Sequence, residues 1–307
     1  MNQQKLPLKA SPTINIAMKN QEPIVAIEST IFAHGLPRPI NLECALQIEE
    51  IIKNEGAVPA IIAIDKGHIN IGCEIDLLEK ITSNQNIEKV STRDIAYTLI
   101  SKKLGATTVA GTITCAAAAN IDVMVTGGIG GIHRNVNNTH DISADLTELQ
   151  RNKVAVVCSG VKSILDVPKT LEALETSSIP VIGYKTESFP CFFSSDSGYP
   201  TSYNAESTEE IAHIINQHAS LNGGILVANP PPKITALDLK KVNKWTEIAQ
   251  KEADNLKISG KQLTPFLLKR LTELSKNKTL KTNIDLVCEN AKIASKIAVS
   301  LCDLNNK

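Results

Sequence analysis

The fold is decided by residues 24–64, which read IVAIESTIFAHGLPRPINLECALQIEEIIKNEGAVPAIIAI. The first apolar run, Ile24–Ile27, has the length and composition of a buried strand. Apolar residues then recur every three or four positions over Leu42–Glu55, and Gly56 follows directly, which predicts an amphipathic helix with a glycine stop. A second apolar run, Pro59–Ile64, comes next. Strand, helix and strand in this order are typical of a parallel α/β unit.

The same alternation continues along the chain. Asp65-Lys66-Gly67 predicts a tight turn. From Ala236 onward the pattern is helical, with Gly260 and Pro265 as interruptions. Because several strands are too uniformly apolar for a sheet with one wet face, we expect a three-layer α/β/α fold with a largely parallel central sheet. The helical C-terminal third should pack on this sheet. The further expected strands are Ile69–Ile71, Thr107–Ala110, Val123–Thr126, Val154–Cys158, Pro180–Gly183 and Gly224–Val227.

Composition narrows the class of protein. The chain has 307 residues, of which 42% are hydrophobic and 21% charged, as in ordinary globular proteins. Its 32 basic residues balance 32 acidic ones, which argues against a dedicated nucleic-acid binder. Seven cysteines without a CxxC pair indicate neither a disulfide framework nor a zinc site. The sequence shows no secretory signal and no apolar run of membrane-spanning length, so we expect a cytoplasmic protein without a membrane partner.

The expected domain organisation is simple. Residues 23–307 should form a single catalytic domain, and residues 1–22 an N-terminal extension that is poorly ordered or peripheral. A separate C-terminal helical domain is the alternative, but no linker-like stretch supports it.

Two segments that follow expected strands carry groups suited to chemistry. In AIESTIFAHGLPRP, residues 26–39, Glu28 ends a strand beside a glycine- and proline-containing loop. A carboxylate there can do acid–base work, although capping a turn or pairing with a surface lysine is the alternative. In TGGIGGIHR, residues 126–134, four glycines would let backbone N–H groups approach an anion. A bare tight turn explains the same spacing, which is neither the dinucleotide fingerprint nor a Walker loop.

Two later segments are also unusual. In THDISADLTEL, residues 139–149, Asp141 and Asp145 flank Ser143 before a helical pattern. These groups can hold a hard cation or a phosphate, or they can simply cap the helix. In VVCSGVKSILD, residues 156–166, Lys162 follows a strand. A lysine that is partly desolvated in a cleft can attack a carbonyl and form an imine, whereas most lysines in such positions are only solvated.

Taken together and in order, these segments resemble the pseudouridine-5′-phosphate glycosidase family from about Pro23 to Ala298. The resemblance implies one α/β/α domain, usually assembled as a homotrimer, with one divalent metal per subunit, typically Mn²⁺. The implied reaction is reversible cleavage of pseudouridine 5′-phosphate to uracil and ribose 5-phosphate, through a lysine imine with the ring-opened sugar. Further motifs that carry the resemblance are KVSTRD, GATTVAGT, PVIGYKTESFPCFF, GGILVANPPP, SGKQLTPFLLKRLTEL and ENAKIA.

The resemblance also implies roles for individual residues. Lys162 matches the nucleophile, Glu28 the proton donor and Asp141 the metal ligand. The unusual His140 beside Asp141 is either a surface replacement or a support for the metal. The positions that match or accompany substrate contacts are Lys89, Val109, Ser143, Ala144, Asp145, His133 and Asn290.

Two other functions are consistent with this pattern. A related C-glycosidase or C-nucleoside synthase acting on another base would keep Lys162 and change the residues that contact the base. A non-catalytic phosphosugar-binding regulator would need neither the acid at Glu28 nor the amine at Lys162.

Overall fold

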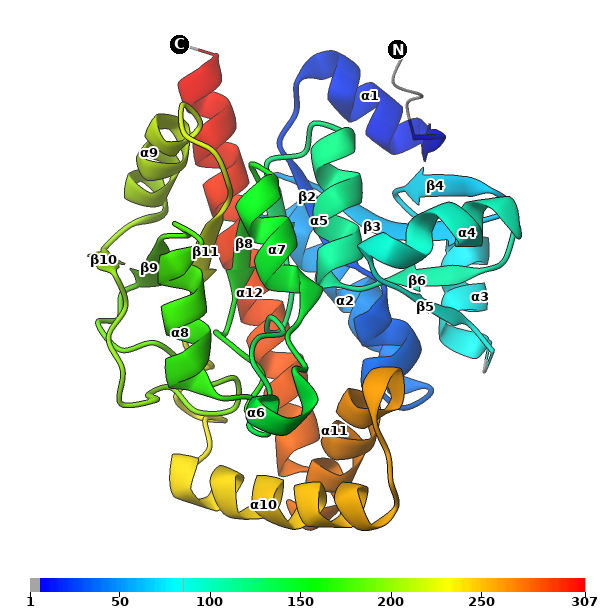
Figure 1. The fold of residues 1–307 in the computed structure, drawn as a ribbon. Helices are drawn as coiled ribbons and strands as arrows, with labels where there is room; N and C mark the ends of the chain where they lie inside the picture. The colour runs from blue at the N-terminus through cyan, green and yellow to red at the C-terminus, as the bar shows by residue number, and fades with distance from the viewer. Residues whose placement is uncertain (1–5, 85, 307) are drawn as a thin grey trace.

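The computed structural model describes residues 6–84 and 86–306, and within them eleven strands form one sheet (Figure 1). The seven strands in the order β3-β2-β7-β8-β11-β9-β10 pair in parallel. β4 and β6 pair with β3 in antiparallel fashion, β1 extends β4 and β5 extends β6. The expected largely parallel sheet is therefore confirmed. The strands are β1 (Leu8–Ala10), β2 (Ile24–Glu28), β3 (Val58–Asp65), β4 (His68–Ile71), β5 (Glu88–Val90), β6 (Gly105–Thr107), β7 (Val123–Val125), β8 (Ala155–Cys158), β9 (Val181–Tyr184), β10 (Tyr203–Ala205) and β11 (Ile225–Ala228).

Helices cover both faces of this sheet, as uniformly apolar strands such as β8 and β11 require (Figure 1). α2, α9 and α12 lie on one face, and α5, α7 and α8 lie on the other. The helices are α1 (Pro12–Asn20), α2 (Ile40–Asn54), α3 (Ile75–Ser83), α4 (Ile95–Ile100), α5 (Val109–Ala118), α6 (Val136–Thr139), α7 (Ala144–Arg151), α8 (Val167–Thr176), α9 (Thr208–His218), α10 (Leu239–Asn255), α11 (Leu263–Leu274) and α12 (Lys278–Asn305), with short turns η1 (Ile31–Gly35), η2 (Thr92–Asp94) and η3 (Gly260–Gln262).

The turn between β3 and β4 forms as expected. Lys66 and Gly67 both have positive φ angles, 50° and 79°, which suit the two central residues of a tight hairpin turn. Gly56 likewise follows α2 with a φ of 85°, so the glycine stop is confirmed.

The strand expected over Thr107–Ala110 is wrong beyond its first residue. Thr107 ends β6, and Thr108 begins α5 by accepting a hydrogen bond from the Gly111 N–H on its side chain. A threonine cap of this kind satisfies an otherwise unpaired helical N–H group, so the apolar residues after it continue as a helix rather than a strand.

The N-terminal segment is peripheral, and the C-terminal third packs on the sheet only in part. β1 pairs with β4 at the edge of the sheet, and α1 buries Ile14 and Ala17, so the N-terminal segment is peripheral but packed into the domain. In the C-terminal third, only α12 packs along the sheet. α10 and α11 lie beyond the carboxyl ends of the strands (Figure 1), where α11 contacts η1 and α12. The helical C-terminal third thus serves partly as a cover over the end of the sheet.

Among the helices described, none combines the length and hydrophobicity of a membrane span.

Candidate active site

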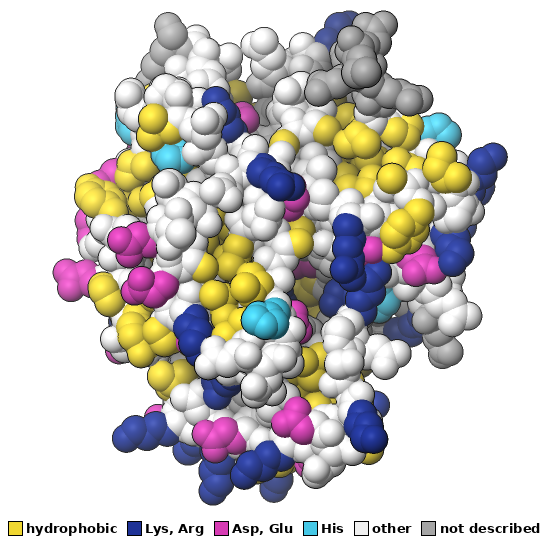
Figure 2. Space-filling view, in the orientation of Figure 1, with side chains coloured by type: hydrophobic (Ala, Val, Ile, Leu, Met, Phe, Trp, Pro, Cys, Tyr) yellow, Lys and Arg dark blue, Asp and Glu magenta, His cyan; other side chains and the backbone are white. Residues whose placement is uncertain are grey.

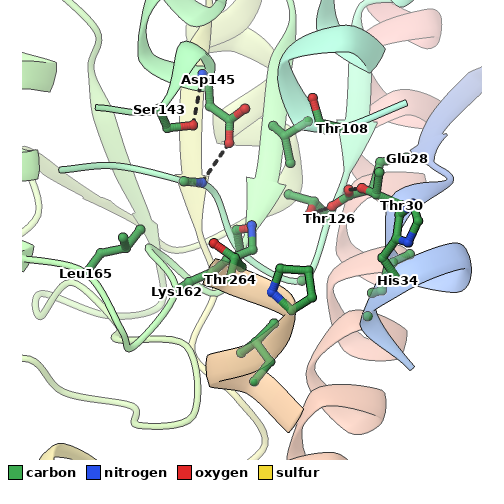
Figure 3. A pocket seen from close by; sticks show the side chains of 18 of the residues that line it. Glu28, Thr30, His34, Thr108, Thr126, Ser143, Asp145, Lys162, Leu165 and Thr264 are labelled. Carbon is green, nitrogen blue, oxygen red and sulfur yellow. Dashed lines mark hydrogen bonds between the residues drawn. The ribbon is translucent and has the colours of Figure 1, made fainter. Parts of the chain in front are cut away.

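A cavity of about 230 Å³ opens at the carboxyl ends of the central strands. From β2 the chain leads to β3 on one side, whereas from the neighbouring β7 it leads to β8 on the other. Ligands of open α/β sheets bind at such a reversal of strand order, because the loops part there. Figure 3 shows Glu28, Thr30 and Thr126 on one side of the cavity and Lys162 and Leu165 on the other.

The Glu28 carboxylate is held by two hydroxyl groups. Thr126, directly after β7, donates to Oε1, and Thr30 donates to Oε2. Glu28 is only 6% exposed, so these bonds fix a buried carboxylate at the last position of β2. A side chain held in this way is positioned to exchange protons with a bound ligand.

Lys162 is positioned by the glycine-rich loop. Its N–H donates to the Ile129 carbonyl at 3.1 Å, and the Ile129 N–H donates to Gly160 at 3.0 Å, so the two segments run side by side. The Lys162 ammonium also donates to the Gly128 carbonyl. Gly160 has a φ of 73°, and a Cβ atom there would clash with the Pro190 carbonyl. The loop therefore orients the lysine rather than forming a bare turn.

Asp145 joins three segments at the wall of the cavity. Its Oδ1 accepts from the Ala110 N–H at 2.9 Å, and its Oδ2 accepts from the Gly130 N–H at 2.7 Å. Ser143 caps α7 by accepting from the Asp145 N–H, as Figure 3 shows. These bonds place the N-termini of α5 and α7 beside the same cavity, where helix dipoles favour an anion.

Basic side chains also line the cavity, and burial shifts the pKa values of several of them. Burial lowers the pKa of Lys89, and repulsion from Lys162 lowers it further. Burial likewise lowers the pKa of His34, assisted by Lys89. For His133, burial lowers the pKa, while Asp141, whose Oδ2 lies 3.6 Å from the ring Nε2, opposes that shift.

The residues present limit how a metal could bind. Across the described part of the chain, no group of three or more His, Cys, Asp or Glu side chains converges on one point. Asp141 lines the cavity with its side chain 39% exposed. This arrangement fits a hard cation that takes one carboxylate from the protein and its remaining ligands from water and substrate oxygens. His140 is exposed, with a φ of 53° at the end of α6, in agreement with the surface interpretation.

The structure brings most of the sequence-predicted residues together. Ala144 is exposed and lies outside the cavity, in an adjoining depression of about 500 Å³ whose lining includes Arg93, Arg151 and Lys261. Figure 2 shows Lys and Arg side chains grouped on the side of this face where β5 and α4 lie. The predicted residues that line the cavity itself are Glu28, Lys89, Val109, His133, Asp141, Ser143, Asp145 and Lys162.

Asn290 requires a correction, because it does not line the cavity. It is fully buried on α12, and its amide is used within the protein. Its Nδ2 donates to the Thr126 carbonyl at 3.0 Å, and its Oδ1 accepts from Asn229 at 3.0 Å. Asn290 therefore supports the start of the glycine-rich loop, in place of the expected contact with substrate.

Asn283, which the sequence analysis missed, lies two turns earlier on the same buried face of α12. It lines the cavity, and its Oδ1 is buried without a hydrogen-bond partner among the described residues. A buried acceptor of this kind is costly unless a ligand donates to it. The signal in the sequence was an asparagine at a helical position flanked by Leu286 and Val287, which face the core.

The chain matches a known protein family over nearly its whole length. Residues 13–300 match the family model described as indigoidine synthase A like protein. The chain is 47% identical to a pseudouridine-5′-phosphate glycosidase of Staphylococcus aureus, covering 96% of each chain. It is 48% identical to the enzyme of that name from Caldanaerobacter subterraneus, covering 95% of each.

Two solved structures share the fold. The prealnumycin C-glycosynthase AlnA, crystallised in complex with ribulose 5-phosphate, superposes with a TM-score of 0.91 at 34% identity, covering 99% of both chains. An indigoidine synthase A-like protein from Thermotoga maritima superposes with a TM-score of 0.89 at 36% identity, covering 98% of this chain and 99% of that one. The chain therefore belongs to the indigoidine synthase A-like family, which includes the pseudouridine-5′-phosphate glycosidases.

Proposed function

We propose that this protein is a pseudouridine-5′-phosphate glycosidase, which reversibly cleaves the C–C glycosidic bond of its substrate to give uracil and ribose 5-phosphate. The observation that carries the proposal is an amine, Lys162, facing a held carboxylate, Glu28, across one cavity. The chain is 47% and 48% identical, over nearly its full length, to two enzymes of that name, which supports the choice of substrate.

The reaction explains why an amine is needed. In pseudouridine the sugar C1′ is bonded to uracil C5, and a carbanion at that carbon is a poor leaving group. The Lys162 amine would bond to C1′ as the ring C1′–O4′ bond opens. Its nitrogen lone pair then forms a C=N bond while the C1′–C5 electron pair moves to the uracil. C5 takes a proton, and water hydrolyses the imine to ribose 5-phosphate and free lysine.

Glu28 is proposed to move these protons. It lies in the cavity with both carboxylate oxygens fixed by Thr126 and Thr30, and so it can serve an opened ribose oxygen or uracil C5 without reorienting. The unpaired Oδ1 of Asn283 suits an N–H group of the uracil ring, which would orient the base.

The 5′-phosphate is proposed to bind between the N-termini of α5 and α7, close to Lys89. Val109 and Ser143 lie at these two helix starts. Asp141 would hold one Mn²⁺ ion per subunit together with water and phosphate oxygens. Such an ion would neutralise phosphate charge and so help to position the sugar. From the resemblance we also propose a cytoplasmic homotrimer.

The test is incubation of the purified protein with pseudouridine 5′-phosphate and Mn²⁺, followed by chromatography for free uracil. Release of uracil together with ribose 5-phosphate is expected. If another C-nucleotide is cleaved instead, the base specificity is different, and if nothing is cleaved although phosphopentose binds, the protein is a regulator.

Synthesis deserves a parallel assay, because one structural relative is a C-glycosynthase. Uracil and ribose 5-phosphate should yield pseudouridine 5′-phosphate with the same protein. Formation of product only with another ring compound would favour a synthase of different specificity.

A further inference from the structure

The segment 254–262, which runs from the last residues of α10 through η3 to the start of α11, forms part of the cavity entrance. Gly260 lines the cavity, followed on α11 by Thr264, Pro265 and Leu268. No residue of 254–262 is fully buried. Ile258 is half-buried against the hydrophobic core, and the other residues of the segment are exposed. Segments with so little buried surface open at low free-energy cost, so a polar contact would help to hold this one in place.

Lys261 supplies such a contact. Its ammonium donates to the Lys89 carbonyl at 3.1 Å and lies 3.0 Å from the Asp94 Oδ2. Lys89 belongs to β5 and Asp94 to η2, on the far side of the cavity entrance. Lys89 is 172 residues from Lys261 in the sequence. One side chain thus ties the C-terminal cover to the β5 wall.

Asp94 is built to receive this charge. Its side chain is only 3% exposed, although its partner is 42% exposed. It also accepts from the Ser91 N–H at 2.9 Å and from the Tyr97 hydroxyl. These donors, together with Lys261, outweigh burial and lower the Asp94 pKa, so the carboxylate stays charged at neutral pH.

The same contact reaches the proposed phosphate site. Lys261 bonds the backbone of Lys89, whose side chain lines the cavity, and its charge contributes to lowering the Lys89 pKa. Closing the segment therefore also sets the position of Lys89.

We propose that Lys261 and Asp94 form a latch, which closes segment 254–262 over the cavity and positions Lys89 for the phosphate of the substrate. Lys261 is a positioning residue in this scheme. Only the positioning of Lys89 for the substrate phosphate rests on the proposed function. Closure of the segment is a property of the protein without substrate.

Closure is tested first without any substrate. Chymotrypsin can cut after Leu256, which is 64% exposed, and mass spectrometry identifies the fragment. Lys261→Met keeps the apolar stem but removes the charge, and should raise the cleavage rate about two- to fivefold, as expected when a partly exposed ion pair is lost. Lys261→Arg should restore slow cleavage. Lys257→Met, at an exposed lysine of the same segment, is the matched control and should behave as wild type.

The effect on the site is tested with ribose 5-phosphate as the probe. Ribose 5-phosphate should slow chymotrypsin cleavage of the wild-type protein. It should slow cleavage of Lys261→Met by a smaller factor. With pseudouridine 5′-phosphate, Lys261→Met should raise KM severalfold with a smaller change in kcat, and Lys261→Arg should reverse most of the increase.

Equal cleavage rates in wild type, Lys261→Met and Lys257→Met would overturn the latch, even if uracil is released normally. Faster cleavage in Lys261→Met without uracil release by the wild type would instead leave the latch standing and reject the proposed activity. Asp94→Asn combined with Lys261→Met should change the cleavage rate by less than the two single changes together, because both remove the same ion pair.

Discussion

Thr126 donates a hydrogen bond to the carboxylate of Glu28 from a position 98 residues away in the sequence, joining the ends of the neighbouring strands β2 and β7. The bond lies at the point where the strand order reverses, inside the cavity that also contains Lys162. The fold thus brings the proposed proton carrier and its support together at a reversal of strand order, where the loops part.

The Thr126 hydroxyl should matter for turnover. Thr126→Val removes a hydrogen bond to a charged group while keeping the shape of the side chain. Such bonds contribute about 1.5–3 kcal/mol, so kcat should fall by about tenfold or more. Thr126→Ser keeps the hydroxyl and should remain close to wild type in steady-state assays of uracil release. Equal rates for the valine and serine variants would show that the bond has no catalytic effect.

Glu28 should be needed for chemistry more than for binding. Glu28→Gln retains the shape, and its amide oxygen can accept from one of the two threonine hydroxyls while its NH2 group donates to the other, but it cannot deliver a proton. We expect kcat to fall about 10²-fold or more with little change in KM. A rise in KM alone would make Glu28 a binding residue instead.

Lys162 should be trapped as an imine. Borohydride added with ribose 5-phosphate should attach a phosphopentose to the peptide containing Lys162, which peptide mass spectrometry detects. Lys162→Ala should prevent labelling, whereas Lys169→Ala, at an exposed lysine in the following helix, should not. Labelling at another lysine would remove the covalent mechanism proposed here.

Asp145 should be important for stability. It is buried, and Asp145→Ala would leave the N–H groups of Ala110 and Gly130 without their acceptor. The free energy of unfolding should fall by about 2–3 kcal/mol, measured by urea denaturation. Asp254→Ala, at an exposed position, is the control and should change it by less than about 0.5 kcal/mol. An unchanged urea midpoint in Asp145→Ala would contradict the structural role.

His34 should make the protein less stable at mildly acidic pH. Its pKa in the folded state is lowered by burial and then by Lys89. Below the ordinary imidazole value of about 6.5 the unfolded chain therefore binds a proton that the folded protein does not, and stability falls as the pH decreases.

His34→Gln should flatten this dependence, measured as the free energy of unfolding between about pH 7.5 and 5.5. The slope should shrink rather than vanish, because the pKa of His133 is lowered as well. Substitution of the exposed His68 by Gln serves as the control. Parallel curves for wild type and His34→Gln would assign the effect to other groups.

Much of the architecture could be predicted because its causes are local. Uniformly apolar runs such as Ile24–Ile27 and Val154–Cys158 require burial on both faces, whatever lies around them. Glu28 and Lys162 could be placed at the end of the sheet because each follows such a run closely. The turn at Lys66-Gly67 could also be predicted, because its signal is local in the sequence.

The remaining features depend on contacts that no local pattern specifies. Thr108 was mistaken for a strand residue because a helix cap and a strand end can carry the same side chain, and only the following N–H groups distinguish them. Asn290 and Asn283 share one face of α12, but one supports the glycine-rich loop and the other faces the cavity. Their different roles follow from where the helix crosses the sheet.

The sequence by itself determined the class of fold and the chemical groups, since both follow from periodicity and from residue types at strand ends. Only the tertiary structure decided which groups meet. The contacts between Thr126 and Glu28, Asp145 and Ala110, and Lys261 and Asp94 each join distant parts of the chain. Such contacts form because packing of the whole sheet and its helices brings their partners within hydrogen-bonding distance. The spacing of residues in the sequence does not specify that packing.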